Sequence, residues 1–214
     1  MADGITVTAA LVNQLRQRSH CGMMECKKAL TEAGGDLEKA VEVLRIRGQV
    51  SAAKRWDRQA QEGFVAAQRS ADRTRAALAQ VNCETDFVAR SETFQAFANA
   101  LAETALQLGG DTMDQLLPVH AASLSNQKLA DALEQLSATT GEKIEVGRVA
   151  FRSLRQGCVQ TYVHLGSKLG VLISLAGATE AEEDLAKDLA MQVAAAAPLY
   201  VAPSAWRPKL DRGF

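Results

Sequence analysis

The stretch Asn82–Arg90, with the sequence NCETDFVAR, lies where the chain changes from strand to helix. The residues before it alternate in the manner of a strand, and those after it repeat with the period of a helix. The connection contains Phe87, a large aromatic residue that we expect to be exposed. Connecting loops lie on the surface, where an exposed aromatic side chain usually serves binding. The stretch therefore predicts a strand-to-helix junction with a binding tip, defined here as residues 85–88.

The elements around the tip predict an antiparallel sheet covered by helices. Two strands, 63–70 and 75–82, precede the tip, and a helix with apolar residues at spacings of three and four follows it up to Gly109-Gly110. The other predicted elements are a loop, a helix and a third strand, at residues 111–123, 129–136 and 144–151.

The third strand changes its apolar face at Gly147. Ile144 and Val146 share one face of a regular strand, whereas Val149 and Phe151 share the other. A glycine at the point of change predicts a β-bulge.

The chain then repeats itself. Residues 157–175 can be laid on residues 63–81 with a constant offset of 94, and a helix follows in both copies. With this offset Thr179 falls on Thr85, but Glu180 and Ala181 fall on Asp86 and Phe87. The scaffold is duplicated and the aromatic tip is not. The repeat therefore favours a specific role for Phe87, because a residue needed only for packing could occur in both copies.

The N-terminal part of the chain predicts three short helices. Gly22 separates the first from the second, Gly34-Gly35 ends the second, and Gly48 ends the third. Met23 and Met24 directly follow the first break, and they cannot both face so small a core. At least one is expected on the surface, where a partner could bind it, although methionine also fills irregular cores.

These patterns predict an α+β protein. Its expected parts are a three-helix domain, a linker, a first core subdomain, an incomplete second core subdomain and a tail, at residues 1–48, 49–62, 63–155, 156–199 and 200–214. The second subdomain lacks a third strand, so we expect an open sheet edge that a partner or a second copy covers.

The composition is that of an ordinary soluble globular protein. Of the 214 residues, 47% are hydrophobic and 23% are charged. A net charge of −1 predicts no broad basic face for nucleic acid. No apolar run is long enough to span a bilayer, and residues 1–4 do not begin a signal peptide. We therefore expect a cytoplasmic protein without direct contact with nucleic acid or membrane.

The chain carries no recognisable catalytic or metal-binding motif. Glycine-rich nucleotide-binding loops, a nucleophile elbow and paired zinc-binding histidines are all missing from the sequence. The four cysteines have no C-x-x-C spacing, so reduced thiols are favoured over a metal site or disulfides. Cys158 and His164 would lie about 20 Å apart along one strand, too far for a nucleophile pair. We expect a binding protein without a cofactor, and not an enzyme.

Several motifs, taken in order, resemble the bacterial elongation factor Ts family, whose members are nucleotide exchange factors for elongation factor Tu. The resemblance covers roughly residues 5–200 and is strongest at residues 81–90. The other matching motifs are Leu11-Val12-x-x-Leu15-Arg16, Gly22-Met23-Met24-x-Cys26-Lys27-Lys28-Ala29-Leu30, Gly35-Asp36, Phe94-Gln95-x-Phe97-Ala98, Gly141-Glu142-Lys143-Ile144, Leu169-Gly170-Val171-Leu172 and Ala190-Met191-x-Val193-Ala194-Ala195.

The resemblance implies a fold and a mechanism. The three-helix domain would be similar to a ubiquitin-associated domain, and the core would contain two similar subdomains. Phe87 would enter an apolar gap beside the Mg²⁺ site of elongation factor Tu, where Thr85 and Asp86 would bond polar groups. The residues implied to contact elongation factor Tu, in its GDP-bound and nucleotide-free states, are Leu15, Arg16, Met23, Met24, Thr85, Asp86, Phe87, Val88 and His164.

The family pattern is incomplete. Residues 19–22 read Ser-His-Cys-Gly where the family usually has Thr-Gly-Ala-Gly, and the C-terminal part with its helical arm is missing. A short exchange factor is the preferred interpretation. The first alternative is a chaperone or assembly subunit that binds elongation factor Tu with little exchange activity. The second is an adaptor of the ubiquitin-associated type, which would not need the tip.

Overall fold

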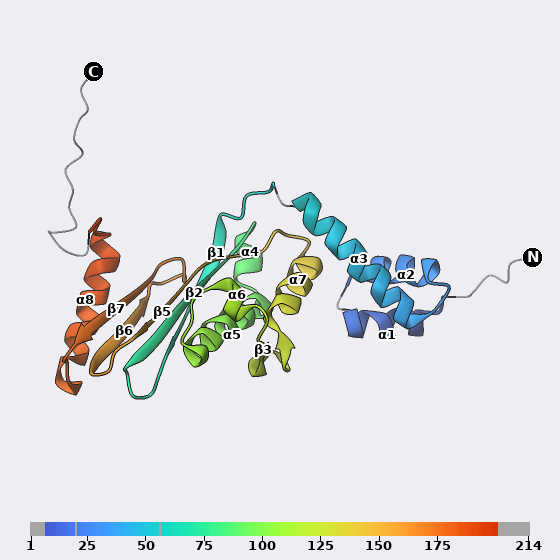
Figure 1. Ribbon diagram of the computed structural model, residues 1–214. Coiled ribbons are helices and arrows are strands. Elements are labelled where there is room, and N and C mark those ends of the chain that lie inside the picture. The colour runs from blue at the N-terminus through green and yellow to red at the C-terminus, as the bar shows by residue number, and fades with distance from the viewer. Residues whose placement is uncertain (1–6, 20, 56, 201–214) are drawn as a thin grey trace, which may run out of the picture.

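The computed structural model describes residues 7–19, 21–55 and 57–200 (Figure 1). An N-terminal bundle of three helices is followed by an α+β core, as predicted. The helices of the bundle are α1 (Ala9–Ser19), α2 (Met23–Glu32) and α3 (Leu37–Arg55). Their common core contains Val12, Leu15, Cys26, Ala29, Leu30, Ala40 and Leu44.

Helix α3 begins directly after Asp36 and ends later than the sequence predicts. The Asp36 carboxylate accepts hydrogen bonds from the backbone N–H groups of Glu38 and Lys39 at 2.9 and 3.1 Å, which caps the helix. The predicted end at Gly48 is wrong, because the helix continues to Arg55 through part of the expected linker. One glycine costs a helix only about 1 kcal/mol, and good helix formers follow it.

Three antiparallel strands form the main sheet in the order β1–β2–β5. They are β1 (Glu62–Arg69), β2 (Arg75–Cys83) and β5 (Glu145–Ser153). The predicted bulge is confirmed, because Gln80 pairs with Arg148 while Val81 pairs with Val146, which leaves Gly147 extra. The extra residue resets the alternation, so that residues 144, 146, 149 and 151 all pack against the same core.

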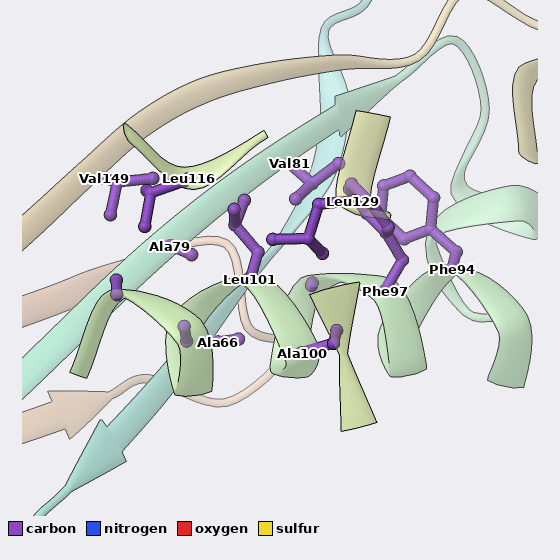
Figure 2. Close-up of a cluster of buried hydrophobic side chains, with 14 of the residues drawn as sticks. Ala66, Ala79, Val81, Phe94, Phe97, Ala100, Leu101, Leu116, Leu129 and Val149 are labelled. Carbon is purple, nitrogen blue, oxygen red and sulfur yellow. The ribbon is translucent and has the colours of Figure 1, made fainter. Parts of the chain in front are cut away.

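Helix α5 (Glu92–Leu108) covers one face of this sheet and supplies more of the buried core residues than any other element. Its Phe94, Phe97 and Leu101 side chains point at the strands in Figure 2 and are at most 2% exposed. The smaller elements around it are α4 (Asp86–Ala89), α6 (Met113–Leu116), β3 (His120–Ala121), the 3₁₀ turn η1 (Ala122–Leu124), β4 (Gln127–Lys128) and α7 (Leu129–Thr140). The loop predicted over 111–123 is therefore partly structured, in elements too short to show a period.

A second hairpin packs on the opposite face of the main sheet. It consists of β6 (Gly157–Val163) and β7 (Gly170–Ala176), and it is followed by the 3₁₀ turn η2 (Glu180–Glu182) and α8 (Glu183–Ala196). Backbone bonds from Val65 to Ser167 and from Val159 to Arg73 join the hairpin to the main sheet at 2.7 and 2.8 Å. Figure 1 shows the resulting layers in the order α8, hairpin, main sheet and α5.

The two hairpins match with the predicted offset. Both Thr85 and Thr179 cap the turn that follows the second strand of their unit. In the first unit β2 has β5 on its other side, whereas β6 and β7 form a two-stranded sheet within the described part of the chain. An ion-pair cluster locks the units together, since Glu183 accepts bonds from Arg69 and Arg73 at 2.7 and 2.6 Å.

The structure also bears on disulfides, metal sites and membrane spans. The cysteines Cys21, Cys26, Cys83 and Cys158 are all free. Among the described residues, no group of three or more possible metal ligands lies together, and no helix has the length and apolar character to cross a membrane.

Candidate functional site

The tip is one turn of helix at the junction of β2 and α5. Thr85 caps this turn, because its hydroxyl oxygen accepts a bond from the Val88 N–H at 3.4 Å. Val88 packs against the main core and Ala89 is buried, so the inner side of the turn is fixed. Phe87 points the other way and is 82% exposed. The predicted exposed aromatic residue is thus confirmed, on a backbone that its neighbours hold in place.

Glu142 holds the tip from a distant part of the chain. Its carboxylate accepts bonds from the N–H groups of Glu84 and Thr85 at 3.0 and 3.1 Å and from the Thr85 hydroxyl at 2.6 Å. Glu142 belongs to the quoted motif at residues 141–144, but no role was predicted for it from the sequence. Only the three-dimensional structure reveals this contact across 57 residues of chain.

Glu84 in turn accepts a hydrogen bond from the segment that contains Glu142. Its carboxylate accepts a bond from the Lys143 N–H at 2.5 Å and another from Arg58 Nη1 at 3.2 Å. Arg58 also donates to the Gly141 carbonyl at 3.3 Å. These bonds and those of Glu142 form a reciprocal clasp, which we define as the contacts between residues 84–85 and 141–143.

The polar groups of the tip serve mainly to shape it. The Thr85 hydroxyl donates to Glu142 and accepts from Val88, so a bond from it to a partner stays a prediction. Asp86 forms an ion pair with Arg90 at 3.1 Å and remains partly exposed. Burial and then the nearby charge of Glu142 raise the pKa of the Cys83 thiol to about 11. The neutral thiol donates to the Thr85 carbonyl at 3.1 Å.

The residues predicted on the N-terminal bundle divide into two groups. Arg16 is exposed, and Met23 and Met24 are 50% and 65% exposed, so both methionines are available at the start of α2. Leu15 is a correction, because it is 0% exposed in the core of the bundle. It lies three residues after Val12 on the face of α1 that packs on the other two helices. It stabilises the bundle and has no surface for a partner.

His164 is exposed at the end of β6, in the turn that leads to β7. Its Nδ1 lies 2.9 Å from the Tyr162 hydroxyl. In the same turn Lys168 pairs with Glu62 at 2.6 Å, and Glu62 lies opposite Cys83, next to the tip. His164 and the tip therefore lie at the same end of the main sheet. Sequence reasoning missed the adjacent Leu165, which is 91% exposed; its only signal was a large apolar residue in a turn.

Comparison with known proteins connects these features to one family. The family model described as Elongation factor TS matches residues 84–209. The chain is 47% identical over 197 residues to elongation factor Ts of Chlorobaculum parvum, covering 91% of this chain and 68% of that one. It is 46% identical over 201 residues to elongation factor Ts of Chloroherpeton thalassium and of Chlorobium luteolum, covering 93% of this chain and 70% of each relative. The chain therefore belongs to the elongation factor Ts family of translation elongation factors.

Proposed function

We propose that this chain is a guanine-nucleotide exchange factor. It binds elongation factor Tu with GDP and promotes GDP release by disturbing the Mg²⁺ site during translation elongation in the cytoplasm. The observation that carries this proposal is Phe87, which is 82% exposed on a tip whose backbone is fixed on both sides. Because the backbone that carries this ring is already held in place, little backbone entropy is lost when a partner buries the ring.

The mechanism follows from the chemistry of GTPases. Their Mg²⁺ ion bridges the protein and the nucleotide phosphates, so a tip that displaces it weakens nucleotide binding. The coupling is reciprocal: bound nucleotide weakens the binding of the factor by the same free energy by which the bound factor weakens the binding of nucleotide. The protein therefore needs affinity for both the GDP-bound and the nucleotide-free partner. It makes and breaks no covalent bond, so we propose no catalytic residue and no cofactor.

Further contacts would hold the partner while the tip acts. We assign this role to Arg16, Met23 and Met24 on the N-terminal bundle and to His164 near the tip. Their exposure supports the assignment. Several weak contacts on one chain raise the effective concentration of the tip at its target. Such contacts would serve a chaperone or assembly subunit equally well, and it is the fixed tip with Phe87 that favours an exchange factor.

We also propose that two copies of the chain form a homodimer through β7. In the first unit the equivalent strand, β2, pairs with β5. Within the described residues β7 pairs only with β6, which leaves an edge that a second copy can extend. Light scattering on the purified chain tests the proposal: a dimer at micromolar concentration is expected, and a monomer contradicts it.

Release of labelled GDP from elongation factor Tu tests the exchange function. The intact chain is expected to accelerate release, and Phe87→Ala is expected to lose most of this acceleration. Leu108→Ala is a suitable control, because it removes an exposed apolar side chain from the opposite end of α5 and is expected to behave like the intact chain. Binding of the intact chain without acceleration would support the chaperone alternative.

A further inference from the structure

The clasp around the tip is more extensive than a helix cap requires. A single side-chain acceptor is enough to cap one turn, and Thr85 already provides it. Glu142 nevertheless accepts three more bonds from Glu84 and Thr85. None of these donors belongs to the β1–β2 ladder, which ends at Cys83. The carboxylate therefore fixes the segment between the strand and the turn.

The second unit shows what the same donors do without a tip. There Thr179 donates from its N–H and its hydroxyl to Glu182, both at 2.6 Å, in a local capping box. With the offset of 94, Glu182 corresponds to Val88 in the first unit. In the first unit the local carboxylate is thus replaced by an apolar residue that packs inward, and Glu142 supplies a carboxylate from elsewhere.

Val88 and Glu142, which take the place of the local carboxylate, fix the tip from two sides. Val88 and Ala89 anchor its inner side in the core, and Glu142 anchors its beginning. The backbone next to Glu142 is itself held by local contacts. Gly141 ends α7 with a φ of +74°, and the Glu142 carbonyl accepts a bond from the Ser137 hydroxyl at 2.7 Å. Phe87, lying between the two anchors, is left with only the outward direction.

We infer that Glu142 is a positioning residue for nucleotide exchange: its carboxylate holds residues 84–85 so that Phe87 is presented in its binding direction before the partner arrives. This inference rests on the proposed exchange function. Glu142 need not touch elongation factor Tu, since its effect passes through the Thr85 backbone and hydroxyl. Because the tip is ordered in advance, less binding energy is spent on ordering it in the complex.

Amide hydrogen exchange on the free chain tests the holding of the tip without any partner. In Glu142→Ala the amides of Glu84 and Thr85 are expected to exchange about tenfold faster or more, because they lose a charged acceptor. Amides in the middle of β2 serve as the internal reference and are expected to keep their rates. Unchanged protection of residues 84 and 85 would overturn the inference, whatever the result with elongation factor Tu.

Release of labelled GDP from elongation factor Tu tests the effect on exchange. Glu142→Ala is expected to lower the acceleration about tenfold or more, because it removes bonds to a charged acceptor. Glu142→Gln keeps an acceptor oxygen for the two amides and is expected to retain most of the activity. The matched control is Glu145→Ala, which removes a nearby carboxylate paired with Lys143 and is expected to act like the intact chain.

The double variant separates positioning from a general structural effect. If Glu142 acts through Phe87, then Phe87→Ala with Glu142→Ala should differ by less than about twofold from Phe87→Ala alone. A full additional loss in the double variant would overturn the inference. So would an active Glu142→Ala protein when Phe87→Ala is inactive. Failure of the intact chain to accelerate release would instead contradict the proposed function, and hydrogen exchange would still decide how the tip is held.

Discussion

Two phenylalanines seven residues apart should respond in opposite ways to the same substitution. Phe87 is 82% exposed at the tip, whereas Phe94 is 0% exposed in the main core. Replacing a buried phenylalanine by alanine costs about 3–5 kcal/mol of stability, a large share of the roughly 5–15 kcal/mol that a folded protein has. Replacing an exposed residue usually changes stability by less than about 0.5 kcal/mol.

For binding to the partner, the substitution at Phe87 is expected to have the larger direct effect. Complete burial of a phenylalanine contributes about 1.5–3 kcal/mol, and most of that remains to be gained at Phe87 because the partner-free ring is in water. Scaled by its 82% exposure, the contribution is about 1.2–2.5 kcal/mol, or roughly 8- to 70-fold in affinity. Phe87→Ala should therefore be a stable protein with weak binding. Phe94→Ala should be an unstable protein.

Urea unfolding followed by circular dichroism measures the stability of each variant, and titration calorimetry measures its affinity for elongation factor Tu. The expected result is an unchanged unfolding midpoint for Phe87→Ala and a clearly lower one for Phe94→Ala. A loss of more than about 1 kcal/mol of stability in Phe87→Ala would refute the argument, since it exceeds what an exposed side chain contributes. Equal affinities of Phe87→Ala and the intact chain would refute it as well.

Two further predictions concern the contact between the two units of the core. In Gly170→Ala the new Cβ would lie 2.5 Å from Val65 Cγ1, so we expect a loss of about 1–3 kcal/mol in urea unfolding; an unchanged midpoint would show that the sheets separate without cost. Hydrogen bonds from Arg69 and Arg73 lower the pKa of Glu183 below its ordinary value of 4.5. A carboxyl group whose pKa is lowered in the folded state stabilises the fold at pH values above its unfolded-state pKa. Glu183→Gln should therefore be less stable than the intact chain at neutral pH. The difference should shrink as the pH falls below about 4.5, and a pH-independent difference would contradict the ion-pair account.

Local patterns in the sequence predicted much of the fold. Gly147 at a change of apolar face indicated the bulge, and the offset of 94 placed Thr179 opposite Thr85. Phe87 was recognised as exposed because a large aromatic residue stood in a connection. Each of these inferences depends on residues within one or two elements, where the side-chain period and the turn chemistry are set locally.

The errors have physical causes that a local pattern does not contain. Gly48 did not end α3, because one glycine is a weak breaker among good helix formers. Leu15 belonged to a family motif, and the motif did not distinguish a residue that holds the bundle together from one that contacts a partner. The role of Glu142 depends on bonds to residues 57 and 58 positions away, which only the tertiary structure brings together.

The central claim is that the tip acts on the Mg²⁺ site of elongation factor Tu, and its most direct test is GDP release with and without a chelator. With Mg²⁺ present, elongation factor Tu should release GDP much faster with the intact chain than with Phe87→Ala. When EDTA has removed the ion, the tip has nothing left to displace, so elongation factor Tu should release GDP at nearly the same rate with the intact chain as with Phe87→Ala. A ratio of rates that stays the same in EDTA would contradict the account, because Phe87 would then act by a route independent of the metal.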